Sequence, residues 1–211
     1  IVTDQEETIW SVERLAEELG ISRQAVRKRI ERKLIPAHKN GRMWYIDEGS
    51  INFDATLIYE YSGKKYYVEK GVVDNSKNGL VECDDGIWYV RSGIVDTGMN
   101  TLVKSNGTWW YVKGGKVAEN ETTLVKYSGI WWYIKNGKID FSARTLCKYN
   151  GNWFFVSSGM VDFRSQTLVK YNGTWWYVRG GYVRFNETTL VKYNGSWFYV
   201  KGGAVNFKTT T

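Results

Sequence analysis

The sequence is poor in the residues that most common enzyme chemistries require. Its 211 residues include one histidine, His38, and two cysteines, Cys83 and Cys147. Two cysteines cannot form a disulfide framework, and one histidine with two distant cysteines leaves no His/Cys metal cluster. A Ser-His-Asp or Cys-His catalytic site would have to use His38, and no motif surrounds it. We therefore expect no enzymatic activity, no metal site and no cofactor, with His38 on the surface or packed.

Long hydrophobic runs are missing too, and the chain has a single proline. No apolar run approaches the roughly 18 residues that a membrane span needs. One proline beside 22 glycines excludes collagen-like and proline-rich classes. What the chain does have is 43% hydrophobic residues, with 11 Trp and 15 Tyr, and a formal net charge of +7. It can build a core, and its basic balance suits anionic partners.

Most of the chain is an internal repeat of 22 residues, as in TLVKYNGTWWYVRGGYVRFNET at 167–188. Five clear copies follow two degenerate ones, and Thr211 matches the first position of an eighth copy. We number these repeats 1 to 7: 56–78, 79–100, 101–122, 123–144, 145–166, 167–188 and 189–210.

Each repeat predicts a strand, a hairpin turn, a returning aromatic strand, a second glycine turn and a short strand. The first turn is Asn-Gly in four repeats, at 106–107, 150–151, 172–173 and 194–195. The adjacent residues Leu102 and Val103 point to opposite faces of the hairpin, and so do Trp109 and Trp110. A lone hairpin cannot bury both faces, whereas stacked copies can. The pattern therefore favours an open β-hairpin solenoid, with a closed ring of hairpins as the alternative.

Residues 1–54 share none of this repeat and predict a small helical domain. Ser11 is expected to cap a first helix that stops at Gly20, and Ser22 a second helix through about Arg32. The tight link between them is that of a helix-turn-helix, and Asn40-Gly41 predicts a hairpin, or wing. We thus expect an α+β chain of two domains: a winged helix-turn-helix at 1–54 and the all-β repeat solenoid at 55–211.

The stretch SVERLAEELGISRQAVRKRIERKLIPAHKNGRMWYID at 11–47 resembles the winged helix-turn-helix of excisionase and MerR-type regulators. The resemblance implies binding to duplex DNA, with the second helix in the major groove. Eight Lys/Arg and one acid between 23 and 42 support it. The alternatives are a solvated basic helix and a protein-interaction module. The candidate base-reading residues are Arg23, Gln24, Arg27 and Lys28, and the candidate phosphate contacts are Arg32, Lys39 and Arg42.

The repeat T-L-V-K-Y-N-G-x-W-W-Y-V-K-x-G is similar to the cell-wall (choline-type) binding repeats of Gram-positive surface proteins and to clostridial toxin repeats. The resemblance implies a hairpin solenoid that holds choline or glycans in aromatic cages between hairpins. One family tryptophan is leucine here, as at Leu102 and Leu146, which removes a cage wall. The candidate ligand-binding aromatics are Trp109, Tyr111, Trp131, Tyr133, Trp153, Trp175, Tyr177, Trp197 and Tyr199.

Two other roles remain open for the repeats. Their aromatics can serve as core alone, since repeated aromatics in a thin solenoid pack first against each other. Their recurrent lysines can follow an anionic polymer such as teichoic acid or single-stranded nucleic acid. These lysines are Lys104, Lys126, Lys148, Lys170 and Lys192.

The two halves point to different compartments. The first hypothesis is a non-enzymatic cytoplasmic protein that binds duplex DNA and uses its array for partner binding or self-association as a homo-oligomer. The second is a cell-surface module whose repeats hold a wall polymer or glycan, with the helical domain as a cap. It requires an upstream secretion signal, which a chain starting at Ile1 rather than Met can have lost.

Overall fold

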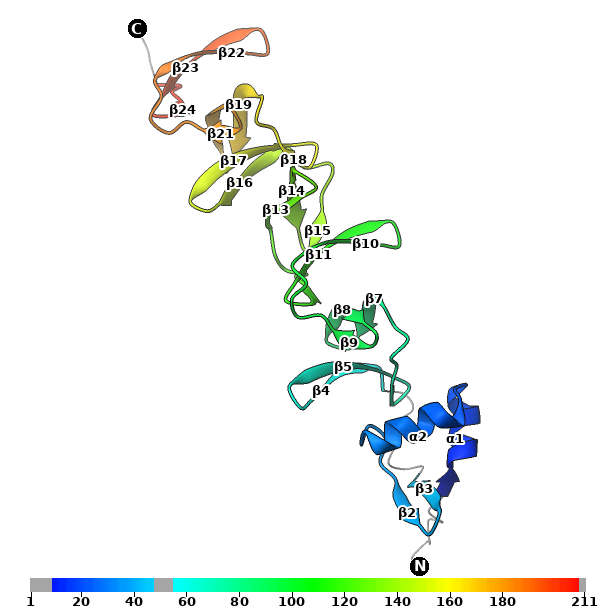
Figure 1. Cartoon of the computed structure of the whole chain (residues 1–211). Helices are drawn as coiled ribbons and strands as arrows, with labels where there is room; N and C mark the ends of the chain where they lie inside the picture. Colours follow the sequence, from blue (N-terminus) through cyan, green and yellow to red (C-terminus); the bar gives the residue numbers. More distant parts are fainter. Residues whose placement is uncertain (1–8, 48–54, 209–211) are drawn as a thin grey trace, which may run out of the picture. The chain divides into compact units, whose positions relative to one another are not determined.

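The computed structural model describes residues 9–47 and 55–208 (Figure 1). The chain forms two compact units, Ile1–Gly98 and Met99–Thr211, which are described separately. The first contains the helical domain with repeats 1 and 2, and the second contains repeats 3 to 7. The domain boundary expected near residue 54 lies outside the described residues and stays a prediction.

The helical domain has the two capped helices that the sequence predicts. Ser11 Oγ accepts a hydrogen bond from the Arg14 amide at 3.1 Å, and Ser22 Oγ accepts one from Ala25 at the same distance. Gly20 ends the first helix with φ of 63°, a left-handed conformation that costs glycine little. The helices are α1 (Val12–Leu19) and α2 (Arg23–Glu31).

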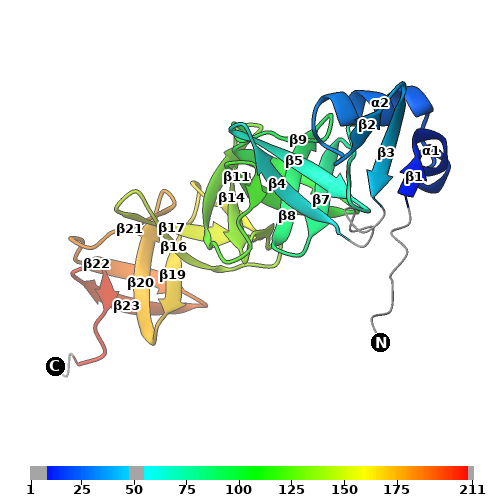
Figure 2. The same cartoon turned by 90° about the horizontal axis from the view of Figure 1, so that it is seen from below.

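Three short strands complete this domain, which is blue in Figure 2. They are β1 (Ile9–Ser11), β2 (His38–Asn40) and β3 (Met43–Asp47), in the sheet order β1-β3-β2. The wing is confirmed, although its two-residue loop is Gly41-Arg42, one residue after the Asn-Gly pair, and the sequence analysis missed β1. The helical and sheet side chains form one core, joined by Val72 of repeat 1.

Every repeat contains two long strands and a short one, as expected. In unit 1 the strands are β4 (Leu57–Tyr61), β5 (Lys64–Glu69), β6 (Val72–Val73), β7 (Gly79–Cys83), β8 (Gly86–Arg91) and β9 (Ile94–Val95). In unit 2 they are β10 (Thr101–Ser105), β11 (Thr108–Lys113), β12 (Lys116–Val117), β13 (Thr123–Tyr127), β14 (Ile130–Lys135), β15 (Lys138–Ile139), β16 (Thr145–Tyr149), β17 (Asn152–Ser157), β18 (Met160–Val161), β19 (Gln166–Tyr171), β20 (Thr174–Arg179), β21 (Tyr182–Val183), β22 (Thr189–Tyr193), β23 (Ser196–Lys201) and β24 (Ala204–Val205).

Residues within a repeat are numbered from Thr101, which is position 1 of repeat 3 and pairs with Val112. Repeat 1, at 56–78, has one residue more than the others. Its Leu57 pairs with Val68 as Thr101 pairs with Val112, so Leu57 and not Thr56 holds position 1. The pairing of Ser105 with Thr108 leaves Asn106-Gly107 as a two-residue turn, with φ of 47° and 77°. Two positive φ values define the type I′ turn that Asn-Gly favours.

Consecutive repeats in unit 2 are joined by backbone hydrogen bonds. The amide of the position-11 aromatic donates to the position-15 glycine of the next repeat, as from Tyr133 to Gly159 and from Tyr177 to Gly203, both at 2.8 Å. Figure 1 shows the hairpins of this unit, green to red, following one another. Among the described residues these hairpins do not close into a ring, so the open solenoid is confirmed.

The solenoid core lies between successive hairpins. Val112, Ile134 and Val156, all at position 12, have no exposed surface, and Tyr177 at position 11 is 1% exposed. Both cysteines are buried, as is common for this small hydrophobic side chain. Burial raises the pKa of the Cys147 thiol to about 11.

Candidate functional site

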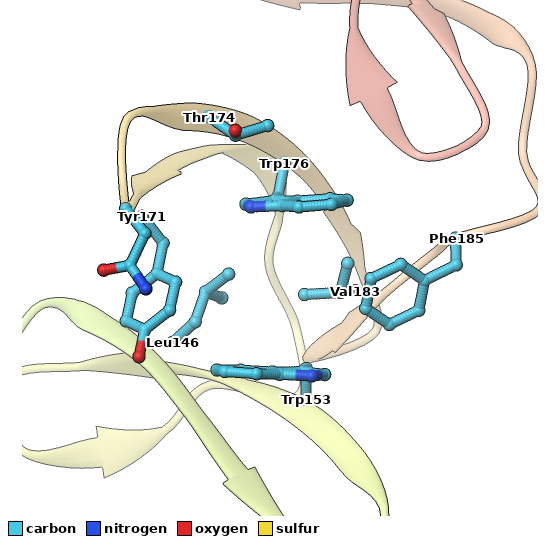
Figure 3. A pocket seen from close by; sticks show the side chains of 8 residues that line it. Leu146, Trp153, Tyr171, Thr174, Trp176, Val183 and Phe185 are labelled. Carbon is cyan, nitrogen blue, oxygen red and sulfur yellow. The ribbon is translucent and has the colours of Figure 1, made fainter.

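An aromatic cavity of about 200 Å³ lies between repeats 5 and 6. Trp153, at position 9 of repeat 5, forms one wall, and Trp176, at position 10 of repeat 6, forms the facing wall (Figure 3). Figure 3 shows the two indole rings one above the other, with open space between them. The remaining lining residues are Leu146, Tyr171, Asn172, Thr174, Val183 and Phe185.

Neighbouring aromatic rings hold both walls in place. Trp153 meets Tyr171 edge-on, with ring centroids 5.2 Å apart, and Trp176 meets Phe185 edge-on at 5.3 Å. Edge-to-face pairs of this kind stabilise ring orientation beyond simple area burial. The cavity therefore presents two fixed π faces and no ionised side chain, an arrangement that attracts an organic cation or stacks a sugar ring.

The nine predicted ligand aromatics lie in different surroundings. Trp109, Trp131, Trp153 and Trp175 each contact the position-5 tyrosine of the following repeat at 5.1 to 5.3 Å, and Trp153 also lines the cavity. The position-11 tyrosines lie on the core side of the hairpin: Tyr133 and Tyr177 are buried, and Tyr111 and Tyr199 are partly buried. Trp197 is 66% exposed.

Sequence reasoning missed Tyr171, Trp176 and Phe185 as lining residues. Trp175 and Trp176 are adjacent and similar, so composition could not say which faces the cavity. The alternation of strand side chains puts position 10 opposite to positions 9 and 11, and only the packing of the next hairpin decides which face opens. Leu146, which replaces a family tryptophan, does line the cavity, as the resemblance implied.

A second hollow, of about 390 Å³, lies in the helical domain between α1, α2 and the wing. Arg27 of α2 and Lys39 and Arg42 of the wing line it together with Trp44 and Tyr45. The Lys39 ammonium lies 5.6 Å from the centroid of the Trp44 ring. Three cations from two elements thus converge on one surface, where they could contact the phosphates of one duplex.

All seven predicted DNA contacts are exposed, and the structure brings Arg27, Lys39 and Arg42 together. Arg23 lies 4.0 Å from Glu13 of α1, at the limit of an ion pair. Gln24, Lys28 and Arg32 lie on α2 or at its end, outside this hollow. His38 is exposed and stacks on Tyr45, with ring centroids 5.7 Å apart.

The repeated aspartates are turn residues. In unit 2, Ser142 Oγ donates to Asp140 at 2.6 Å and Ser165 Oγ donates to Asp162 at 2.5 Å. These hydroxyl hydrogen bonds are the largest cause of the lowered pKa of each carboxyl group. Within residues 9–47 and 55–208 no three acidic, histidine or cysteine side chains gather as a metal site. No helix in the described part of the chain has both the length and the hydropathy to cross a membrane.

Fold and site together define a helix-turn-helix domain followed by hairpin repeats that enclose an aromatic cavity, and comparison with known families agrees. The chain belongs to the choline-binding repeat family, whose model matches more than half of it. A helix-turn-helix domain model matches residues 11–52. The seven matched repeats are residues 56–74, 76–96, 98–118, 120–140, 144–162, 165–184 and 186–206.

Solved structures show similar chains, while no curated protein matches. CbpJ from Streptococcus pneumoniae TIGR4 is 19% identical over 82% of this chain and 60% of that chain, with a TM-score of 0.34. Choline binding protein F from Streptococcus pneumoniae is 21% identical over 83% and 59%, with a TM-score of 0.31. The Cpl-1 endolysin complexed with a peptidoglycan analogue is 18% identical over 80% and 44%, with a TM-score of 0.30. This chain spans about 60% of the length of the first of them.

Proposed function

We propose that this chain is a non-enzymatic protein that binds duplex DNA through its helix-turn-helix domain and a second ligand through its repeats. The observation that carries the DNA proposal is the convergence of Arg27, Lys39 and Arg42 on one hollow beside the recognition helix. Helix α2 would enter the major groove, with Arg23, Gln24, Arg27 and Lys28 towards base edges. Arg32 and the wing residues would contact the phosphate backbone. A protein of this kind acts in the cytoplasm.

Fluorescence anisotropy with labelled duplex DNA tests this proposal at two salt concentrations. We expect the full chain to bind more weakly as salt rises, because bound cations release counterions from the DNA. Arg27→Ala should weaken binding by about 1–3 kcal/mol at both salt concentrations, because it removes a proposed base contact. The matched control is Arg164→Ala, which removes an exposed arginine from repeat 5. Equal effects of the two variants would place the DNA on the repeats and contradict the proposal.

For the repeats we propose a cationic ligand of the choline type, held between Trp153 and Trp176. The aromatic cavity of repeats 5 and 6 supports this proposal, as does the family to which the repeats belong. Choline carried on a wall polymer would make the repeats a cell-surface module, with the helical domain as a cap. This cell-surface alternative places the protein outside the cell, whereas the DNA-binding hypothesis places it in the cytoplasm. Both assign the same chemistry to the cavity.

Isothermal titration calorimetry with choline tests the cavity. A quaternary ammonium against aromatic faces gains up to about 2 kcal/mol. Trp176→Ala should therefore weaken choline binding about tenfold. Trp197→Ala, which removes an exposed tryptophan outside the cavity, is the control. The neutral analogue of choline, with carbon in place of nitrogen, should bind more weakly. Equal binding of the neutral analogue would show a cavity that selects for shape, not charge.

A further inference from the structure

The junction between repeats 1 and 2, called the first cleft below, corresponds by strand register to the junction that holds the aromatic cavity between repeats 5 and 6. Trp88 pairs with Val81 across its hairpin as Trp176 pairs with Val169, so both tryptophans hold position 10. Lys65 pairs with Glu60 as Trp153 pairs with Lys148, so Lys65 stands at position 9, in the place of Trp153.

The chain puts its own ammonium group into this first cleft. Lys65 Nζ lies 5.0 Å from the ring centroid of Trp88, within the range of a cation–π contact. Lys65 is partly buried, whereas its neighbour Lys64 is exposed. Trp88 is buried, with 7% of its surface exposed.

Negative charge around this cleft favours the ammonium. Asp85 accepts a hydrogen bond from the indole Nε1 of Trp88 at 2.9 Å, and Asp84 precedes it in the same turn. Glu60 lies directly opposite Lys65 in the strand register. Repeats 5 and 6 carry Asn-Gly at this turn and a lysine opposite their position-9 tryptophan, so they offer neither of these carboxylates there. In repeats 3 and 4 that lysine does reach the position-9 ring, with Lys104 Nζ 5.9 Å from Trp109 and Lys126 Nζ 6.0 Å from Trp131. Among the described residues no lysine or arginine stacks on Trp153 or Trp176.

We propose that Lys65 is a built-in occupant of the cleft between repeats 1 and 2. This cleft is therefore closed to cationic ligands, whereas the cleft between repeats 5 and 6 is open. The proposal rests on the proposed binding function, because it takes the two clefts as equivalent sites for an organic cation. Position 9 then determines which clefts bind: tryptophan builds a wall, and lysine fills the space.

Fluorine NMR of the full chain labelled with fluorotryptophan tests occupancy without any ligand. The resonance of Trp88, assigned with Trp88→Phe, should shift in Lys65→Ala because the ring loses its ammonium. Lys64→Ala removes the same charge one residue away and should leave this resonance in place. A Trp88 resonance unchanged by Lys65→Ala overturns the proposal, whether or not any ligand binds.

Titration of the same samples with choline tests the closed and open states. In the unsubstituted chain the Trp176 resonance should move and the Trp88 resonance should not, whereas in Lys65→Ala both should move. If choline shifts the Trp88 resonance in the unsubstituted chain, the proposal is overturned. It is also overturned if, in Lys65→Ala, choline shifts the Trp176 resonance but not the Trp88 resonance. If choline leaves the Trp176 resonance unchanged in every sample, the proposed binding function is contradicted instead. The ligand-free comparison of Trp88 resonances then still tests whether Lys65 occupies the first cleft.

A second variant keeps the test decisive if Lys65→Ala folds poorly. Lys65→Trp installs the residue that repeats 3 to 7 carry at this position. It should add one choline equivalent per chain in calorimetry, while Lys64→Trp should add none. An unchanged stoichiometry for Lys65→Trp overturns the proposal.

Discussion

Gly159 illustrates how one residue in each repeat lets the next repeat approach. Its φ is 75°, and a Cβ atom there would lie 2.6 Å from the carbonyl oxygen of Asp140 and 2.7 Å from the Cα of Phe141. Its own carbonyl accepts the hydrogen bond from Tyr133 of the preceding repeat at 2.8 Å. Glycine is needed here for two reasons, the left-handed backbone and the contact with the preceding turn.

Gly151 shares the left-handed backbone of Gly159 but not its close contact. Its φ of 79° is nearly the same, but a Cβ atom there would meet nothing within 4 Å. We expect Gly151→Ala to lower the free energy of unfolding by about 1–2 kcal/mol, the cost of a left-handed alanine. Gly159→Ala should cost about 1–3 kcal/mol more, because the backbone of repeat 4 must move. Urea denaturation of both variants measures the difference, and equal losses would mean that the close approach relaxes freely.

Individual tryptophans also differ by their neighbours and not by their identity. Trp153 and Trp175 each pack at an angle against the tyrosine of the following repeat, and Trp153 also faces the cavity, whereas Trp197 is exposed, although all three hold position 9. Each hairpin is nearly the same, and what covers its tryptophan is supplied by the following repeat. The cavity proposed as a ligand site is therefore formed by a pair of repeats, not by one repeat.

Among the elements, α2 depends on its cap more than on its composition. It has nine residues, of which only Val26 and Ile30 are buried, and its first turn carries no acid. Isolated helices of this length are marginal in water. Ser22, which accepts from the Ala25 amide at 3.1 Å, therefore adds to the packing of Val26 and Ile30 in holding α2 in place.

We expect Ser22→Ala to destabilise the helical domain by about 1 kcal/mol. Ser22→Asp retains a capping acceptor and adds a favourable charge at the helix N-terminus, so it should restore most of that loss. Hydrogen exchange at the α2 amides is the suitable measurement, because it reports this domain apart from the repeats. Ser22→Asp behaving like Ser22→Ala would show that the cap is not what holds α2.

At the scale of the whole molecule the charge is uneven. Residues 1–54 hold nine Lys/Arg against ten Asp/Glu, and the rest of the chain holds 20 against 12. The repeats are therefore the more basic part, although the proposed DNA contacts lie in the nearly neutral part. Under the DNA-binding proposal, local convergence of cations, as at Arg27 and Arg42, would decide where a duplex binds, while net charge would raise the rate of encounter.

The stability of the repeat array should fall in acid. Asp140 and Asp162 have a folded-state pKa below the ordinary value, chiefly because serine hydroxyls donate to them. Their stabilisation is complete above the unfolded pKa of about 4 and is lost as pH falls through the folded pKa values. We expect Tm to be nearly constant from about pH 7 to 5 and to drop below about pH 4.

Asp140→Asn provides the control for this pH dependence. The amide cannot ionise, so thermal melting monitored by circular dichroism should show a smaller loss of Tm between about pH 5 and 3 than in the unsubstituted chain. An unchanged acid slope in Asp140→Asn would remove this carboxylate from the explanation.

Much of this architecture could be predicted from the sequence because the signals are local. Ser11, Ser22 and Gly20 act within one helical turn, and Asn106-Gly107 acts within one hairpin, so neighbouring residues suffice to identify them. The period of 22 predicted the stacking of hairpins, since neither face can stay exposed. The strand β1 escaped prediction because three residues carry too little pattern to distinguish a strand from a loop.

Which side chains line the aromatic cavity was decided only by tertiary structure. Tyr177 and Trp176 are adjacent aromatics on opposite faces of the strand. Tyr177 is buried in the core, where its amide donates to Gly203 of the next repeat, whereas Trp176 lines the cavity. Leu168 is 1% exposed and Leu190 is 60% exposed, although both are position-2 leucines. The sequence by itself determined the repeat, its turns and the helix caps. The packing of one repeat on the next decided which identical side chains become core and which become a site, because burial depends on what lies opposite.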